Sequence, residues 1–220
     1  MNKNSFIQLC DISYKIKEKI LFEEVSFNLN LGECVVLVGK NGSGKTTLSK
    51  IIMGILKPAF GTVKLLDKDI RDYSLAERGR EIGYCFQNPE KQIFNPTVKE
   101  ELLFYYRFTK QKEKDYTEIT KFFNIDHLLE SKTLTLSQGE KQRLALAIIL
   151  MLEPKFLILD EPSTGLDYNN RAQLYSIINR LKVEKNIGSL IISHDKALIN
   201  SCADYIYRIK DRGIEIERQV

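Results

Sequence analysis

One glycine-rich segment has the residue types and the spacing that binding a polyphosphate requires. Glycines lack the Cβ atoms that would keep backbone N–H groups away from a phosphate. A lysine near the end of the segment adds a point charge for the outer phosphates, and the threonine after it carries a hydroxyl that can ligate Mg²⁺. A continuous apolar run precedes the segment and helical spacing follows it, a context that disfavours a chance glycine-rich turn. The segment reads Gly39-Lys40-Asn41-Gly42-Ser43-Gly44-Lys45-Thr46, and Thr47 comes next.

A second candidate is an acidic pair, Asp160 and Glu161, at the end of a short apolar run that predicts a buried strand, Phe156–Leu159. Asp160 is predicted to hold Mg²⁺ through water. Glu161 is predicted to polarise an attacking water as a general base. Acidic residues end many strands of α/β proteins, so the pair is weak evidence by itself. Together with the glycine-rich segment it predicts a nucleotide-hydrolysing site.

A third candidate lies at the predicted start of a helix, in Leu136-Ser137-Gln138-Gly139-Glu140. A serine hydroxyl, a glycine N–H and the positive end of a helix make an anion site that faces outward. The alternative is a plain helix cap, because Ser137 and Glu140 also fit the capping-box pattern.

This third segment resembles the LSGGQ signature of the ATP-binding cassette (ABC) ATPases. The glycine-rich loop and the acidic pair match motifs of the same family, and the resemblance covers essentially the whole chain. In that family the signature meets the γ-phosphate bound by the opposite subunit. The resemblance therefore implies that Ser137 and Gly139 contact a nucleotide held by a partner cassette. Gln138 and Glu140 replace the family's Gly and Gln, and Glu140 adds a negative charge near a phosphate. We expect activity because the contacting serine and glycine remain.

The resemblance assigns four further positions. Tyr14 lies where the family places an aromatic residue that stacks on adenine, with a core tyrosine on a strand face as the rival interpretation. Gln87 matches a glutamine that contacts Mg²⁺ and reports the nucleotide state to the helical lobe. Residues 163–167 look like the D-loop, which crosses the dimer interface. His194 matches the switch histidine near the γ-phosphate; a structural histidine at a strand end is the alternative.

Residues 86–98 are similar to the ATPases of energy-coupling factor importers, which include the cobalt, nickel and vitamin types. In those proteins this segment and the helical lobe receive the coupling helices of a transmembrane partner. We therefore expect a transmembrane subunit to dock between Gln87 and Val98. Gln92 would belong to the groove that receives its coupling helix. Many members continue into a C-terminal dimerisation segment, whereas this sequence stops at Val220, so a shortened member or another importer class stays open.

An α/β scaffold is needed to bring these residues together. Apolar and β-branched runs predict the strands Phe6–Ile12, Leu21–Leu29, Glu33–Val38, Phe156–Leu159 and Ser189–Ile192. Apolar spacing predicts one helix that begins near Lys45 and another around Arg171–Lys182. The segment from about Asn88 to Ser131 is predicted to be a helical insertion.

The resemblance implies a P-loop NTPase fold: a RecA-like core with an N-terminal antiparallel β subdomain, plus an inserted α-helical subdomain. We expect a single ABC ATPase domain over residues 1–220. The nucleotide-binding core would comprise 1–86 and 153–220, and the helical subdomain with the signature would comprise 87–152.

Composition limits the classes of function. The chain has 220 residues, 43% of them apolar, and a mild net charge of +4 that predicts no nucleic-acid partner. The longest apolar run, Leu144–Leu152, is far short of the roughly eighteen residues of a membrane span. The N-terminus lacks the apolar region of a secretory signal. We therefore expect a cytoplasmic protein, held peripherally on the inner face of the cell membrane by a partner.

The function predicted from the resemblance is a two-state motor. Two cassettes, identical or different, close over two ATP molecules with Mg²⁺, and hydrolysis reopens them to drive uptake through a transmembrane partner. Lys45, Glu161 and His194 are the predicted catalytic residues. The first alternative is a soluble ABC ATPase without a transporter, such as a cluster-assembly helper. The second, a P-loop kinase or nucleotide switch, leaves the signature and His194 unexplained.

Overall fold

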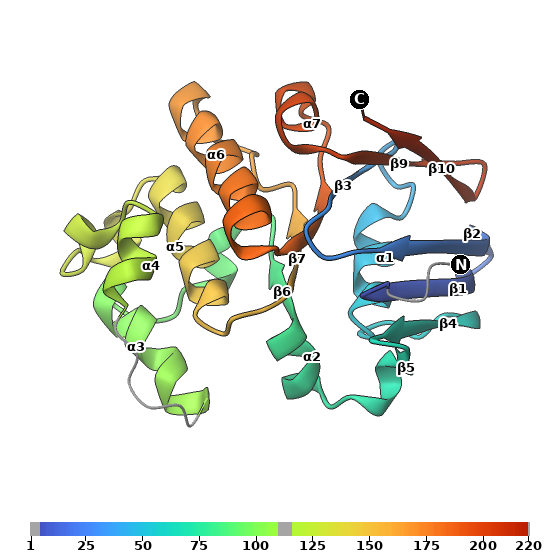
Figure 1. The fold of residues 1–220 in the computed structure, drawn as a ribbon, viewed down its shortest axis with the longest axis horizontal. Coiled ribbons are helices and arrows are strands. Elements are labelled where there is room, and N and C mark those ends of the chain that lie inside the picture. The colour runs from blue at the N-terminus through green and yellow to red at the C-terminus, as the bar shows by residue number, and fades with distance from the viewer. Residues whose placement is uncertain (1–4, 110–115, 220) are drawn as a thin grey trace.

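The computed structural model describes residues 5–109 and 116–219 of the protein, and these residues form two β-sheets flanked by helices (Figure 1). Residues 110–115, which fall in the predicted helical insertion, lie outside the described residues. The order within the first sheet is β2 (Lys19–Leu29), β1 (Ile7–Ile16), β4 (Phe60–Leu65) and β5 (Lys68–Asp69), and every pairing is antiparallel.

The second sheet is the core sheet. Its order is β10 (Gly213–Arg218), β9 (Tyr205–Lys210), β3 (Cys34–Val38), β8 (Gly188–Ile192), β7 (Phe156–Asp160) and β6 (Ile82–Cys85). The strands from β9 to β6 are parallel, and β10 joins β9 as an antiparallel edge. Because parallel strands end at the same edge of a sheet, the loops after β3, β7 and β8 meet there.

The residues of strand β3 are apolar because both faces of the strand are covered. Val36 and Val38 pack into one hydrophobic cluster with the helices Gln138–Leu150, Tyr168–Lys185 and Lys196–Cys202. Val35 and Leu37 pack into another, with the helix Lys45–Ile52 and the antiparallel sheet. A strand covered on both faces has no position at which a polar side chain reaches water, so its sequence is a continuous apolar run rather than an alternating one.

The helices surround the core sheet on both faces. They are α1 (Lys45–Ile52), α2 (Leu75–Glu81), α3 (Val98–Thr109), α4 (Thr117–Phe122), α5 (Gln138–Leu150), α6 (Tyr168–Lys185) and α7 (Lys196–Cys202). Short 3-10 turns are η1 (Ile70–Asp72), η2 (Pro89–Gln92), η3 (Asp126–Leu128) and η4 (Thr133–Thr135). In Figure 1, α3, α4 and α5 gather at one end of the molecule, coloured green to yellow, away from the antiparallel sheet.

The predicted layout of an antiparallel N-terminal sheet, a parallel core and inserted helices matches this structure. The helices α3 to α5 fall inside the range 87–152, although the boundaries of the two subdomains stay a prediction. Helix α6 is longer than expected because Asp167 caps it: the Asp167 Oδ1 atom accepts a 2.8 Å hydrogen bond from the N–H of Asn170. No helix among the described residues combines the length and the apolar character needed to cross a bilayer.

Candidate active site

A cavity of about 490 Å³ opens where β3 and β7 end at the edge of the core sheet. Nine of the residues singled out from the sequence line it: Asn41, Gly42, Gly44, Lys45, Thr46, Thr47, Gln87, Asp160 and Glu161. Ile16, Lys19, Leu21 and Ile192 complete its described lining. The glycine-rich loop, Gln87 and the acidic pair, which are far apart in the sequence, therefore line the same cavity.

The glycine-rich loop wraps this cavity. Gly44 has φ = 104°, and a Cβ atom there would lie 2.7 Å from the Phe22 ring, so only glycine fits between the loop and β2. Lys45 is buried, and its ammonium group donates to the carbonyl oxygens of Gly39 at 2.8 Å and Lys40 at 3.2 Å. The loop backbone thus holds the charge of Lys45 at the N-terminus of helix α1, where the helix dipole also favours an anion.

Oxygen atoms from three elements form a chain beside the loop. The Thr46 hydroxyl donates to Asp160 Oδ2 at 3.1 Å, and the Tyr84 hydroxyl donates to the same oxygen at 3.3 Å. Ser49 Oγ lies 3.2 Å from the Tyr84 hydroxyl. Burial, together with Asp160, raises the pKa of Tyr84 to about 12, so this phenol stays a neutral donor. Asp160 is therefore held in one orientation, facing Thr46.

Glu161 follows in a strained backbone conformation, with φ = 49°. Its N–H donates to the carbonyl of Ile192 at 2.9 Å, which ties the end of β7 to the end of β8. His194 Nε2 then lies 3.9 Å from Glu161 Oε1. Burial raises the pKa of Glu161, an effect that the nearby His194 and Lys45 oppose. A carboxylate with a raised pKa is a stronger base toward water.

Tyr14 is absent from the described lining of the cavity, whereas Ile16 belongs to it. The half-buried side chain of Tyr14 packs against the hydrophobic cluster between the two sheets. Strand β1 has register irregularities between Ile12 and Tyr14 and again between Tyr14 and Lys15, and such bulges change which side chains face a given side of a sheet. Stacking of Tyr14 on adenine stays a prediction, with a tyrosine that packs on the core as its rival interpretation.

Ser137 and Gly139 lie outside this cavity, at the start of α5. Ser137 caps the helix together with Glu140: Glu140 Oε2 accepts from the Ser137 backbone N–H at 2.7 Å and from its hydroxyl at 2.8 Å. The Glu140 N–H reaches back to Ser137 Oγ at 3.3 Å, which completes the capping box. Hydrogen bonds from the Ser137 backbone lower the pKa of Glu140, so a carboxylate occupies the signature.

Asn170 of α6 packs against Gly139. A Cβ atom at Gly139 would lie 2.2 Å from Asn170 Oδ1, an atom that also accepts a 2.8 Å hydrogen bond from Arg143. The Asn170 amide donates to Asp167 Oδ2 at 2.9 Å. The start of the signature helix is therefore fastened to residues 163–167, the predicted D-loop.

The predicted docking segment is braced from within. Gln92 accepts a hydrogen bond from the Phe86 N–H and donates to the Tyr84 carbonyl, both at 2.9 Å. Its side chain thus holds the end of β6 and the turn that carries Gln87. Phe86 and Phe94 have exposed side chains beside this turn.

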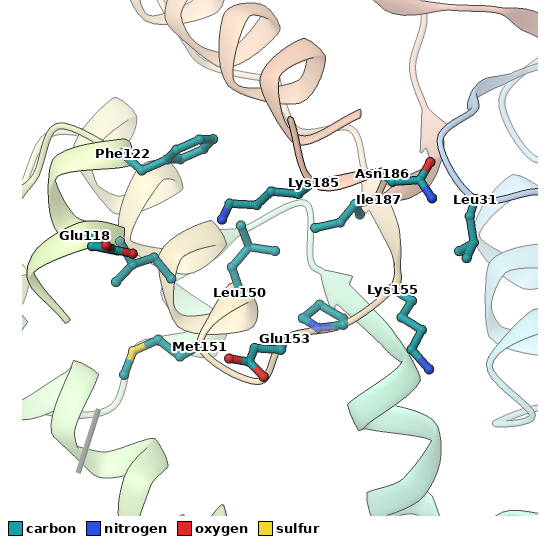
Figure 2. A pocket seen from close by; sticks show the side chains of 12 residues that line it. Leu31, Glu118, Phe122, Leu150, Met151, Glu153, Lys155, Lys185, Asn186 and Ile187 are labelled. Atoms are coloured by element: carbon teal, nitrogen blue, oxygen red, sulfur yellow. The ribbon is translucent and has the colours of Figure 1, made fainter. Parts of the chain in front are cut away.

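A second cavity, of about 760 Å³, contains none of the predicted residues among its described lining (Figure 2). It lies between α4, the end of α5 and the end of α6, and its walls are mainly apolar, as Phe122, Leu150 and Ile187 show. Lys185 Nζ lies 5.8 Å from the centre of the Phe122 ring. This second cavity is therefore a cleft between helix α4 and the ends of α5 and α6.

Sequence reasoning missed Ile16, Lys19 and Leu21 as cavity residues, and it gave Tyr84 no role. Ile16, Lys19 and Leu21 belong to the β1–β2 hairpin, which reaches the loop only because the two sheets pack together; Lys19 Nζ lies 3.4 Å from the Gly42 carbonyl. Tyr84 lies three residues before Gln87 in the sequence, and this closeness to a predicted site residue could have marked Tyr84 as a candidate.

The family model described as ABC transporter matches residues 22–164. A putative HMP/thiamine import ATP-binding protein, YkoD, of Bacillus subtilis (strain 168) is 34% identical over 213 residues, which cover 97% of this chain and 39% of the relative. The chain thus spans about two fifths of the length of that relative.

Two solved structures have the same fold, which confirms the predicted P-loop NTPase class. One is cbiO1 of Clostridium perfringens, described as part of the ABC transporter complex cbiONQ; the TM-score is 0.86 at 29% identity, covering 96% of this chain and 87% of that one. The other is a dimeric ATP-binding cassette in a post-hydrolysis state bound to ADP and Pi, with a TM-score of 0.80 at 25% identity, covering 96% of this chain and 98% of that one.

Proposed function

The chain belongs to the ABC transporter family, whose cassettes hydrolyse ATP, and from that premise we propose that it energises uptake through a transmembrane partner of the energy-coupling factor type. The cargo class we propose is a vitamin or a metal ion. The observation that carries the ATP-hydrolysing part of the proposal is the convergence of the phosphate loop, the acidic pair and Gln87 on one cavity.

The residues present fit Mg²⁺. Thr46 Oγ1 and Asp160 Oδ2 are 3.1 Å apart, and Gln87 lines the same cavity. Hydroxyl, carboxylate and amide oxygens are the ligands that this hard cation takes, with water in the remaining positions. We propose that these three residues hold Mg²⁺, which when bound neutralises charge on the phosphates of ATP.

The protein's own groups do the rest of the chemistry. Lys45 and the loop N–H groups bind the phosphates and hold them in line for attack. Glu161 takes a proton from the attacking water, and His194, whose Nε2 atom lies 3.9 Å from Glu161 Oε1, is proposed to orient the γ-phosphate. The contribution of the chain is thus positioning and electrostatics rather than a covalent step.

Ser137 and Gly139 are proposed to act on a second nucleotide. They lie outside the described lining of the cavity in their own chain, so we propose that the triphosphate they contact is held by a second cassette, identical or homologous. The solved dimer with ADP and Pi supports such an arrangement. The γ-phosphate would then be held from two sides, and its loss would reopen the pair.

The membrane partner is proposed to dock on the segment Gln87–Val98. Two large apolar side chains face water here: Phe94, within the segment, is 69% exposed, and Phe86, directly before it, is 43% exposed. Gln92 stiffens the turn between this surface and the cavity, so docking and nucleotide state can influence each other. The chain would then sit peripherally on the cytoplasmic face of the membrane.

Co-purification from detergent-solubilised membranes tests the transporter assignment. The chain should retain a transmembrane protein, and Phe94→Glu should release it because a charge would enter an apolar contact. Phe60→Glu is a matched control, since Phe60 is also 69% exposed but belongs to β4 of the antiparallel sheet. Recovery of the wild-type chain with soluble factors only would overturn the importer function.

A further inference from the structure

We propose that Tyr175 is a positioning residue for ATP hydrolysis, acting through Asp195 to hold His194 beside Glu161. Tyr175 lies in α6, which packs against α7, and its carbonyl oxygen accepts a 3.7 Å contact from Sγ of Cys202 in α7. Asp195 follows His194 directly and caps α7. The role of Tyr175 rests on the proposed function, because it has meaning only if His194 takes part in hydrolysis.

The contact itself is short and partly buried. The Tyr175 hydroxyl donates to Asp195 Oδ2 at 2.5 Å, and the Tyr175 side chain is only 8% exposed. Burial by itself would raise the pKa of Asp195, but hydrogen bonds from Tyr175 and from the N–H groups of Leu198 and Ala197 lower it. Asp195 is therefore an ionised acceptor, and hydrogen bonds to charged groups are the stronger ones.

Asp195 is held by several hydrogen bonds besides the one from Tyr175. Its Oδ1 atom accepts from the N–H of Ala197 at 2.9 Å and of Leu198 at 3.3 Å. Its own N–H donates to Ser193 Oγ at 3.1 Å, and Ser193 is fully buried. His194 stands between these two anchored residues, so its backbone position follows from theirs.

The same carboxylate connects to the D-loop. Arg171, one turn before Tyr175 on α6, has its Nη1 atom 3.7 Å from Asp195 Oδ2. The Nε atom of Arg171 donates to the carbonyl of Leu166 at 2.9 Å. One face of α6 thus links residues 163–167, which are predicted to cross the dimer interface, to the loop that carries His194.

A buried tyrosine with a satisfied hydroxyl can also be purely structural. Tyr207 is such a residue: it is 6% exposed, and its hydroxyl donates to the Asn28 carbonyl at 2.9 Å. Its partner is a backbone atom of β2, remote from His194 in the sequence and outside the lining of the nucleotide cavity. What separates Tyr175 is that its partner is the residue next to His194.

The test compares Tyr175→Phe with Tyr207→Phe in the full chain. Tyr175→Phe should lower kcat about tenfold, the scale of one hydrogen bond to a charged group, and leave the Kd for ATP within twofold. Tyr207→Phe should leave kcat unchanged. Since Tyr175 is proposed to act through His194, adding Tyr175→Phe to His194→Ala should change the residual single-turnover rate by less than twofold.

Two results would overturn the proposal: a kcat for Tyr175→Phe within twofold of wild type, or an undiminished tenfold loss in the His194→Ala background. If Tyr175→Phe does not fold, Asp195→Asn replaces it, because asparagine still caps a helix but is a weaker acceptor for Tyr175. Asp195→Asn is expected to lower kcat in the same way. A wild-type chain that hydrolyses no ATP would refute the proposed function instead, so the two failures are distinguishable.

Discussion

The hydroxyl oxygen of Thr46 lies 3.1 Å from Oδ2 of Asp160, although 114 positions separate the two residues in the sequence. Thr46 belongs to the first turn of α1, and Asp160 ends β7. The strands β3, β8 and β7 are consecutive parallel neighbours, so the loop after β3 and the end of β7 reach the same edge. The proposed Mg²⁺ site exists because of that strand order.

Glu161→Gln is predicted to bind ATP but to hydrolyse it at least about a hundredfold more slowly, since glutamine cannot accept the proton of water. The variant should accumulate as an ATP-bound dimer on size-exclusion chromatography, because the shared γ-phosphate persists. Hydrolysis at the wild-type rate would mean that Glu161 is not the base.

Ile16→Ala is predicted to weaken ATP binding roughly three- to fivefold, the loss of about 1 kcal/mol of apolar contact at the cavity. Tyr14→Leu should leave the Kd within twofold if Tyr14 only packs against the core cluster, as its absence from the described cavity lining suggests. Titration with a fluorescent ATP analogue measures both. A tenfold loss for Tyr14→Leu, with a correctly folded protein, would support the adenine-stacking interpretation instead.

Glu140→Gln is predicted to strengthen ATP-dependent dimerisation roughly fivefold, about 1 kcal/mol, because it removes a unit charge facing the partner's triphosphate. The capping box should survive, since glutamine also serves at that position. Analytical ultracentrifugation with ATP measures the dimer.

The chain offers a matched control for this prediction. Ser74 and Glu77 form the same capping box at the start of α2, with Glu77 Oε2 2.7 Å from the Ser74 N–H. Glu77→Gln removes an identical charge away from the signature and should not change dimerisation. An equal gain in both variants would indicate an effect of net charge alone.

Gly139→Ala is predicted to lower the free energy of unfolding by about 1–3 kcal/mol, because its Cβ would displace the Asn170 side chain and break the Arg143 and Asp167 hydrogen bonds. Thermal unfolding measures the loss. Adding Asn170→Ala should recover part of it by making room for the methyl group.

Gly79→Ala serves as the comparison, since a Cβ there meets no atom within 4 Å and alanine favours helix α2. Its melting temperature should be unchanged or higher. If both glycine variants melt at the wild-type temperature, the packing of Asn170 on Gly139 carries no stability.

Much of the core site could be read from local pattern. The apolar run Cys34–Val38, the glycines after it and the helical spacing after Lys45 are all adjacent in sequence, and each constrains the backbone directly. The Ser137–Glu140 cap was predictable for the same reason, because a capping box joins residues only three positions apart.

Side-chain direction on β1 could not be read in this way. The prediction for Tyr14 used its place in a family pattern, which gave no indication that Ile16, beyond the register irregularities of β1, lines the cavity. A bulge depends on how β1 pairs with β2 and β4 at once, and those pairings are set by residues far from Tyr14 in the sequence.

The sequence by itself determined which groups are available: a loop that admits phosphate, an acidic pair at a strand end and a polar cap that opens a helix. Tertiary structure decided which of them meet. The contacts of Asp160 with Tyr84 and of Asp195 with Tyr175 arise when whole strands and helices pack, so no short stretch of residues encodes them. Local chemistry follows from neighbours along the chain, whereas the geometry of a site follows from neighbours in space.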